Sequence, residues 1–248
     1  MKEKMTHQIV PTRVPSKHYD ALMAAGPQSL VYHGGPVLTS VQIKAVLWGD
    51  PWTNDPAASG MVAPIGNFLQ WIVTSALIDQ LAEYSPPTQK IVHGAYRGSV
   101  AVSGAVGAKI TDSDVQAVLT NLWKTEPGLG ANALWIVFLP PNVQVSAFNE
   151  GSCVDFCGYH EALGATAYGV IPFPDCAPCL GGTPALDSLT SVLSHEICEA
   201  ITDPFANGWY ASNGYEIGDM CAVPTWQQKQ LGGYTVQKEW SNNLNACV

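Results

Sequence analysis

Charged side chains are scarce in this 248-residue sequence. Asp, Glu, Lys and Arg make up 12% of the residues, about half of their share in an average globular protein. Basic residues are the scarcer kind, since 11 Lys and Arg stand against 20 Asp and Glu and leave a net charge of -9 at pH 7. Nucleic-acid phosphates require a basic surface, so we expect no nucleic-acid partner and little affinity for an anionic membrane.

Long hydrophobic runs are also lacking, which excludes a membrane span and predicts a soluble chain. The first twenty residues contain no apolar core of a signal peptide, so export would need a signal already removed or another route. We see no internal repeat, low-complexity tract or phosphate-binding glycine loop. Residues 1–30 contain three prolines and no periodicity, which indicates an N-terminal arm before a single domain at residues 31–248.

Cysteine, by contrast, is plentiful, and seven cysteines with so few charges indicate a secreted protein. Four cluster in a loop-like segment and could form two disulfides, which we favour, or a zinc knot: Cys153, Cys157, Cys176 and Cys179. Their pairing is open, because four cysteines allow three connectivities. Cys221 and Cys247 could form a third bridge at the C-terminus. Cys198 is then left as a buried free thiol.

The hydrophobic pattern predicts an α/β (α+β) fold in which a mixed sheet packs on helices and disulfides staple the loops. Apolar or alternating runs predict strands at residues 41–48, 90–102, 133–139 and 165–172. Helical periodicity predicts helices at residues 63–84, after a loop at 49–60, and at 111–123. The cysteine-containing residues 151–160 are expected to form a loop.

A further helix is expected at residues 188–204, SLTSVLSHEICEAITDP. Its apolar residues recur every three or four positions and form a stripe that would pack on a core. Asp187 or Ser188 would cap its start, and the Asp203-Pro204 pair would end it. His195 and Glu199 lie four residues apart and therefore share another face of the helix.

The His-Glu-Ile-Cys-Glu sequence of this helix is one residue away from H-E-x-x-H, in which two histidines bind zinc and the glutamate activates water. Here Glu199 replaces the second histidine, and a carboxylate can also bind zinc. An anionic ligand makes the metal a poorer Lewis acid, so calcium or manganese also become candidates. Glu196 would be the general base. The alternative is an ordinary His/Glu pair on a solvated helix face.

Other candidate ligands lie on both sides of this helix. Downstream, Glu216 and Asp219 in GYEIGDMC stand at about the spacing where thermolysin-type enzymes place a third ligand and an aspartate that orients the first histidine. Upstream, His160 in CGYH is the other candidate for the third ligand. The sequence therefore predicts a metal site of His195 and Glu199 with Glu216 or His160.

Several motifs together resemble the phosphate-induced protein 1 family, whose plant members are called EXORDIUM. They are YHGGPVLT before a strand that ends in WG, the FCGYH loop, CAPC, SHEICEAITDP followed by NGWY, and EIGDMC, and they extend from about residue 32 to the C-terminus. The resemblance implies secretion and disulfides, and makes H-E-x-x-E a family feature from which Cys198 is a departure. The family has no established reaction. The order of elements also resembles the zincin metalloprotease scaffold.

The leading hypothesis is a secreted metal-dependent hydrolase, a zincin-like peptidase that acts on a peptide or protein with zinc, or else calcium, as cofactor. Glu196 would take a proton from water and Asp219 would orient a metal ligand. A second hypothesis is a non-catalytic extracellular module that binds glycan or protein, with a structural metal or none. A cysteine hydrolase using Cys198 is the weakest, since acidic neighbours raise a thiol's pKa.

Overall fold

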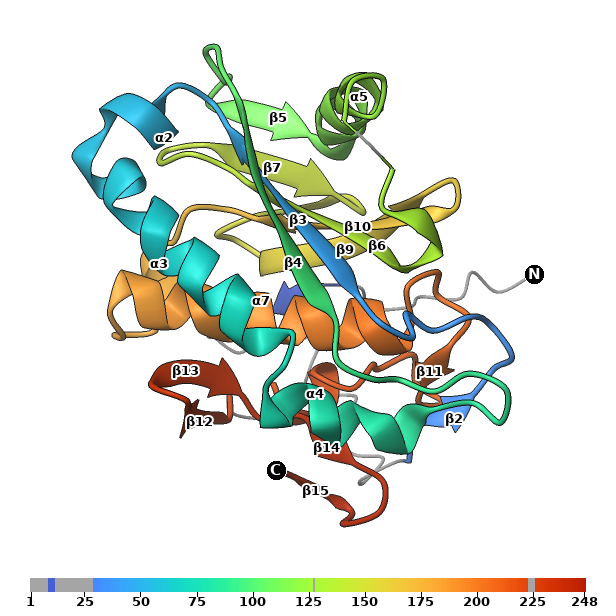
Figure 1. Ribbon diagram of the computed structural model, residues 1–248. Coiled ribbons are helices and arrows are strands. Elements are labelled where there is room, and N and C mark those ends of the chain that lie inside the picture. Colours follow the sequence, from blue (N-terminus) through green and yellow to red (C-terminus); the bar gives the residue numbers. More distant parts are fainter. Residues whose placement is uncertain (1–8, 12–28, 127, 223–225) are drawn as a thin grey trace.

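The computed structural model describes residues 9–11, 29–126, 128–222 and 226–248. Its centre is a six-stranded mixed sheet (Figure 1). In spatial order the strands are β1 (Ile9–Pro11), β9 (Phe156–Leu163), β10 (Thr166–Ile171), β6 (Ala133–Phe138), β3 (Gln42–Trp48) and β4 (Ala95–Val102). The last four are parallel, whereas β9 runs antiparallel to β10 and β1 antiparallel to β9. The expected mixed sheet packed on helices is confirmed.

Strand β6 is central and buried on both faces. Leu134, Ile136 and Phe138 belong to one hydrophobic cluster, and Trp135 and Val137 belong to the other. Successive side chains of a strand point to opposite faces, so an uninterrupted apolar run suits a strand that is covered on both sides. The sheet therefore separates two cores.

Helices cover both faces of this sheet (Figure 1). On one face lie α3 (Pro56–Ile72) and α7 (Ala185–Thr202). On the other lie α5 (Asp112–Leu122) and a small sheet made of β5 (Lys109–Thr111), β7 (Gln144–Ala147) and β8 (Glu150–Gly151). Helix α7 also contacts the hairpin of β12 (Gln228–Leu231) and β13 (Tyr234–Gln237), so it lies between the sheet and the C-terminal region.

The remaining elements are short. Two strand pairs are β2 (Val31–Tyr32) with β11 (Trp209–Tyr210) and β14 (Trp240–Ser241) with β15 (Ala246–Cys247). The helical turns are α2 (Pro51–Asn54), α4 (Ala76–Gln80), α6 (Ala177–Leu180), η2 (Leu81–Tyr84), η3 (Gly130–Asn132) and η4 (Asp219–Cys221).

Helix boundaries near residues 49–84 differ from the expectation. The expected loop at 49–60 holds α2 and the start of α3, because the Asp55 carboxylate accepts from the amides of Ala57 and Ala58 and caps α3. The expected single helix at 63–84 is broken after α3, where the Ser75 side chain caps a new helix, α4. The apolar periodicity identified the buried face of these helices, but it did not identify the capping residues at which they begin.

Helix α7 begins earlier than expected, with Pro184 at the N-cap position. Neither expected cap acts as one. The Ser188 hydroxyl donates to the carbonyl of Cys179, and the Asp187 carboxylate accepts from the Thr235 hydroxyl. Both side chains tie the helix to neighbouring segments instead. The end is as predicted, since α7 stops at Thr202 before Asp203-Pro204.

Two segments expected to be irregular contribute strands to the central sheet. The second half of residues 151–160 begins β9, and β1 lies within the N-terminal region predicted to be an arm. Val10 is fully buried there, with Gly158 as its partner in the β1–β9 register. The rest of that arm, residues 1–8 and 12–28, lies outside the described residues.

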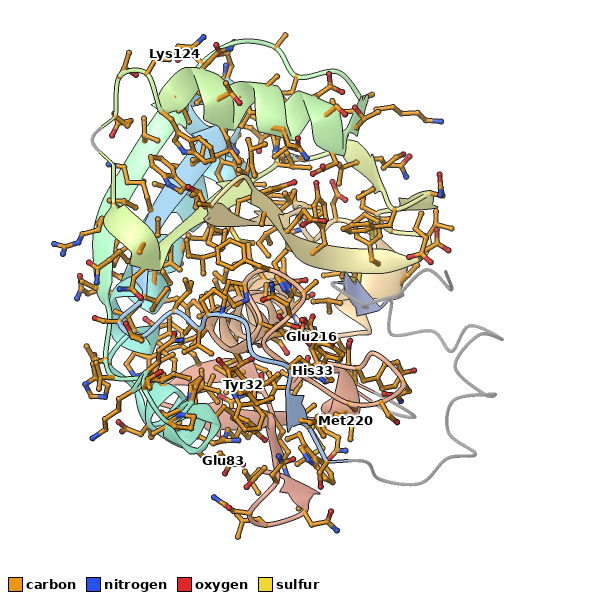
Figure 2. The ribbon with its side chains drawn as sticks, turned by 90° about the vertical axis from the view of Figure 1, so that its right-hand side faces the viewer. Tyr32, His33, Glu83, Lys124, Glu216 and Met220 are labelled. Carbon is orange, nitrogen blue, oxygen red and sulfur yellow. A yellow bond between two sulfur atoms is a disulfide. The ribbon has the colours of Figure 1, made fainter. Side chains whose placement is uncertain are left out.

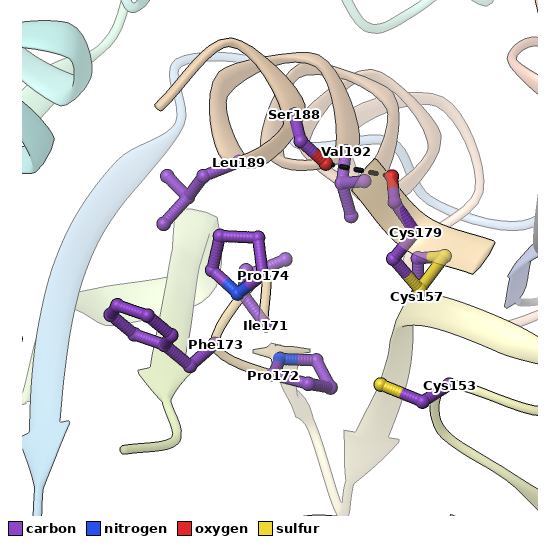
Figure 3. A pocket seen from close by; sticks show the side chains of 10 residues that line it. All are labelled: Cys153, Cys157, Ile171, Pro172, Phe173, Pro174, Cys179, Ser188, Leu189 and Val192. Carbon is purple, nitrogen blue, oxygen red and sulfur yellow. Dashed lines mark hydrogen bonds between the residues drawn. A yellow bond between two sulfur atoms is a disulfide. The ribbon is translucent and has the colours of Figure 1, made fainter. Parts of the chain in front are cut away.

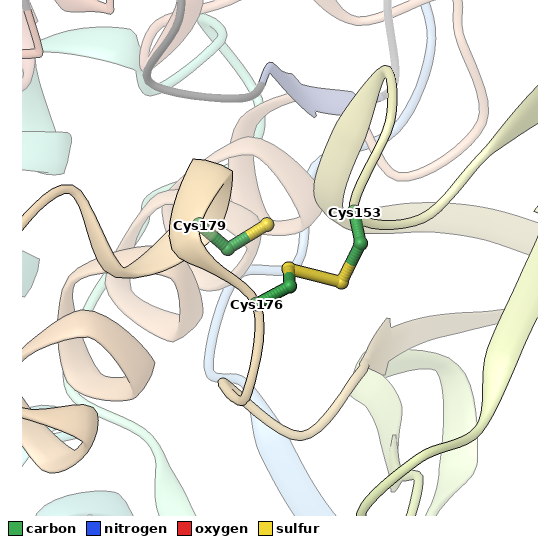
Figure 4. Close-up of side chains that lie close together, drawn as sticks. All are labelled: Cys153, Cys176 and Cys179. Atoms are coloured by element: carbon green, nitrogen blue, oxygen red, sulfur yellow. A yellow bond between two sulfur atoms is a disulfide. The ribbon is translucent and has the colours of Figure 1, made fainter.

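Three disulfides staple the loops, as expected. Cys153 is bonded to Cys176, as Figure 4 shows beside Cys179, and the other pairs are Cys157–Cys179 and Cys221–Cys247. A zinc knot at the first four is excluded, because their sulfurs are consumed by the two bridges. Cys198 is free and buried, also as expected.

By length and composition, the segment Pro56–Tyr84 is apolar enough to cross a membrane, with a mean hydropathy of 1.5 in its best window. This is weak evidence for a span. The segment consists of α3, α4 and η2, and its apolar side chains, among them Phe68 and Ile72, contribute to the core beside α7.

Candidate metal centre

Helix α7 carries the centre of the candidate site. Every residue from Ser188 to Thr202 is buried, so the helix has no solvated face. An entirely buried helix has polar residues only where they find partners. This burial excludes the alternative in which His195 and Glu199 form an ordinary pair on a solvated surface.

His195 and Glu199 face each other across one turn of α7. The imidazole Nε2 of His195 lies 2.9 Å from Glu199 Oε1, and the same carboxylate oxygen accepts the backbone N–H of Asp219 at 3.1 Å. The Asp219 side chain approaches from η4, with Oδ1 at 4.0 Å from His195 Nε2. These three side chains form a first group of donors, with one suitable atom each, all within 4.8 Å of one another.

His160 reaches the same helix from the sheet. On β9, Tyr159 belongs to the core on the α5 side, so the next side chain, His160, points to α7. Its Nδ1 lies 3.1 Å from Glu196 Oε2 and 3.6 Å from Glu199 Oε2. Gly158, two residues earlier, lets the helix approach, because a Cβ there would lie 3.2 Å from Glu196 Oε1.

Glu216 completes a second group of donors. Its Oε2 lies 3.7 Å from His160 Nε2, and His160, Glu199 and Glu216 offer donor atoms within 4.8 Å of one another. Figure 2 places Glu216 beside α7, on the opposite side of the sheet from Lys124 and α5. The two groups share Glu199.

The structure thus brings together all the side chains predicted for the site, and each is almost completely buried: His160, His195, Glu196, Glu199, Glu216 and Asp219. The geometry divides them differently from the expectation. Asp219, predicted to orient a ligand, is itself among the donors nearest to His195, whereas Glu216 lies at His160. Their role as metal ligands stays a prediction.

Sequence reasoning missed the residue that orients His195. Gln237, on β13, lies with its Oε1 at 2.8 Å from His195 Nδ1, and its Nε2 donates to the carbonyl of Gly218 at 2.5 Å. The amide nitrogen is committed to that carbonyl, so the amide oxygen must accept a proton from His195 Nδ1. His195 Nε2 then carries a lone pair. No motif marks Gln237, which is 42 residues from its partner in the sequence.

The lone pair of His195 Nε2 faces carboxylate oxygens, which also lack protons when ionised. Acceptors this close repel one another unless a cation or a proton lies between them. His160 Nε2, Glu199 Oε2 and both oxygens of Glu216 are likewise buried without a hydrogen-bond partner. Buried polar atoms of native proteins are almost always paired. The unpaired atoms of both groups of donors therefore fit a bound cation.

Electrostatics supports the same conclusion. Burial is the largest cause of the raised pKa of Glu196, Glu216 and Asp219, and repulsion by the Glu199 carboxylate is the next. Burial also raises the pKa of Glu199. Two more buried carboxyls, of Asp203 and Glu239, have raised pKa values, again mainly through burial. Among the described residues no Lys or Arg side chain is buried to compensate these charges.

The imidazoles are suited to act as ligands. Burial, and then the charge of His195, lowers the pKa of His160 to about 3, and burial lowers that of His195. Both rings are therefore neutral at physiological pH, the form that binds metal. Each group of donors offers one imidazole nitrogen and two carboxylates, a combination that suits zinc or manganese.

Two features cover the site. The backbone N–H of Val10 on β1 donates to the Glu196 carboxylate. Trp226 stacks over His195, with the ring centroids 5.7 Å apart and the planes inclined by 11°. The candidate ligands are thus enclosed between the sheet edge and the C-terminal region.

Other candidates lie apart from this cluster. A pocket at the first turns of α7 is lined by apolar side chains such as Ile171, Phe173 and Val192 and by the Cys157–Cys179 bridge, with no candidate ligand among its lining residues (Figure 3). Cys198 is fully buried, and burial raises the pKa of its thiol well above the usual value. A protonated, enclosed thiol is not a nucleophile, which weakens the cysteine-hydrolase hypothesis.

The sequence relationships agree with the resemblance noted from the motifs. The chain is similar to EXORDIUM-like proteins of Arabidopsis thaliana. It is 23% identical to Protein EXORDIUM-like 5 over 285 aligned positions, which cover 88% of this chain and 77% of the relative. It is 24% identical to Protein EXORDIUM-like 3 over 241 positions, covering 77% and 68%. No family model and no solved structure matches the sequence.

This similarity and the three disulfides are compatible with an extracellular protein. The names of these relatives imply no reaction and no metal. The metal, the hydrolase activity and the zincin scaffold therefore stay predictions from this chain's own residues.

Proposed function

We propose that this chain is an extracellular metal-dependent hydrolase that cleaves peptide bonds, with its metal at the cluster around Glu199. The observation that carries the proposal is the orientation of His195. Its Nδ1 proton is held by Gln237, so its Nε2 lone pair points at the Glu199 and Asp219 carboxylates, an arrangement that a cation stabilises.

His195, Glu199 and Asp219 would hold the ion, with His160 and Glu216 adjacent to it. When bound, such an ion supplies a Lewis acid that polarises a carbonyl group and makes water a better nucleophile. Zinc suits these ligands best. Calcium suits them less, because it prefers six to eight oxygen ligands and two of the donors here are imidazoles.

Glu196 would move the proton. Its Oε2 lies 3.1 Å from His160 Nδ1, whereas its Oε1 has no hydrogen-bond partner. Burial and the Glu199 charge raise the pKa of Glu196 well above the ordinary value. A carboxylate with a raised pKa is a better base, and can take a proton from water and pass it to the leaving amine.

The second candidate is an extracellular binding module in which the metal is structural. The complete burial of every donor favours it, because structural metal sites are closed whereas catalytic sites keep an open position. Under this account metal stabilises the fold and no bond is cleaved. A reaction, in contrast, requires substrate to reach the site past β1 or Trp226.

A Glu196→Gln variant separates the two candidates. Hydrolysis of a mixed peptide library, followed by mass spectrometry, should occur with the purified wild type and fall by a factor of about 100 or more in the variant, while metal content is unchanged. The matched control is Glu239→Gln, which changes another buried carboxyl that is in neither group of donors. Metal-loaded wild type without any cleavage would leave the binding module as the better account.

A further inference from the structure

We propose that the cluster holds two divalent ions bridged by the carboxylate of Glu199. This inference deepens the proposed function and rests on its premise that the cluster binds metal. It assigns His160 and Glu216 to a second ion, whereas the function proposed above requires only one.

The two oxygens of Glu199 face different partners. Oε1 lies 2.9 Å from Nε2 of His195, and Oε2 lies 3.6 Å from Nδ1 of His160 and has no hydrogen bond. Glu199 belongs to both groups of donors, so its carboxylate is the one that would bridge two ions. Such carboxylate-bridged pairs occur in hydrolytic enzymes, where two ions share the charge of the reacting group.

Each imidazole also has a carboxylate of its own. Asp219 belongs to the His195 group and Glu216 to the His160 group, and the donors fall into two groups of three, not one of five. Both histidines have a buried Nε2 without a hydrogen-bond partner. A single ion at His195 would leave Nε2 of His160 and both Glu216 oxygens buried and unpaired, which is costly.

The charge of the cluster also favours two ions over one. Four carboxyls lie within 4.0 Å of the two histidines: Glu196, Glu199, Glu216 and Asp219. No Lys or Arg side chain is buried among the described residues, so divalent ions would compensate this acidic cluster. Imidazole with carboxylate is a donor set for zinc or manganese.

Metal stoichiometry tests the inference. The purified full chain is dialysed against zinc, then against zinc-free buffer, and analysed for metal per chain. We expect about two equivalents in the wild type and about one in each of Glu216→Gln and Asp219→Asn, since each variant disables one group of donors. Glu239→Gln should keep both. Circular dichroism identifies any variant that fails to fold.

A second measurement does not depend on variants. After loading with manganese, the electron paramagnetic resonance spectrum of the wild type should show exchange coupling between two neighbouring ions. One equivalent in the wild type with an uncoupled spectrum would overturn the second site. Two coupled ions without any peptide cleavage would support the second metal site and contradict the hydrolase. The two proposals can therefore fail separately.

Discussion

Gln237 fixes the orientation of His195 through a hydrogen bond of 2.8 Å, although it lies on another element, the C-terminal hairpin. Its own amide nitrogen is held by the carbonyl of Gly218, in the loop that carries Asp219. One side chain thus ties the helix, the hairpin and the carboxylate loop together. A residue that sets the tautomer of a ligand also sets its affinity for metal.

Replacing Gln237 by alanine should weaken metal binding by about 10- to 100-fold, because His195 loses the acceptor that orients its lone pair. Competition with a chromophoric chelator measures the affinity. Gln230→Ala is the matched control, since Gln230 lies on the same hairpin and bonds to Thr235 instead. Equal affinities for wild type and Gln237→Ala would show that Gln237 does not position a ligand.

A methyl group at Gly218 should disturb the site directly. A Cβ there would lie 2.5 Å from His195 Nδ1, although the φ of -77° would accept any residue. Gly218→Ala must therefore displace the imidazole, and we expect metal affinity to fall at least about tenfold and stability to fall by about 1–3 kcal/mol.

Gly60→Ala is the control for this substitution. Gly60 lies inside α3, and a Cβ there would have no neighbour within 4 Å. It should raise stability by up to about 1 kcal/mol and leave metal binding unchanged. Thermal unfolding with and without chelator distinguishes the two variants. A Gly218→Ala variant with unchanged stability and metal binding would contradict the close approach of Gly218 to His195.

Strand β1 should control access to Glu196. Val10→Pro removes the backbone N–H that donates to the Glu196 carboxylate. We expect zinc to exchange faster in this variant, measured by transfer to a fluorescent chelator, and peptide cleavage to accelerate if the hydrolase account holds. The Val10→Ala variant keeps the N–H, so its zinc should exchange more slowly than that of the Val10→Pro variant. Equal rates would place the route to the site elsewhere.

The stability of the metal-free protein should fall as pH rises. Carboxyls whose folded pKa is raised above about 4.5 bind more protons in the folded state, so their stabilisation is present below pH 4.5 and is lost as pH climbs through the folded pKa. His160, with its pKa lowered to about 3, acts in the opposite sense between pH 3 and 6.5. Above pH 6.5 His160 makes no further contribution, so stability should decline as the carboxyls lose their protons.

Bound metal should reverse this trend, since an ion competes with protons for the same groups. Urea unfolding at pH 6.5 and 8, with chelator and with zinc, provides the comparison. Stabilisation by zinc should be larger at pH 8. An equal zinc effect at both values would mean that the buried carboxyls are not the ligands.

Much of the fold could be predicted from local pattern. The apolar run of β6, the buried stripe and proline stop of α7, and the free state of Cys198 all follow from residue type and spacing. The residues at which helices begin could be predicted less well. The first turn of α7 uses Asp187 and Ser188 to bind neighbouring segments, and such tertiary partners leave no signal in a single sequence.

Only the site residues that lie in recognisable motifs could be predicted from the sequence. Spacing pointed to Glu216 and Asp219 and to the approach of Asp219 to His195, but not to the position of Glu216 at His160, because that depends on how the segment before η4 folds back against α7. Gln237 and Val10 have no motif at all and act through a side-chain amide and a backbone N–H. Contacts between segments that are far apart in the chain leave no local pattern in the sequence.

The central claim, that the buried cluster is a metal site, is tested most directly by elemental analysis of the protein as purified without added metal, beside a His195→Ala variant. The account predicts a stoichiometric divalent metal, zinc above all, in the wild type, and loss of at least one ion in the variant. No metal in the wild type, even after zinc is supplied, or an unchanged content in His195→Ala, would contradict it.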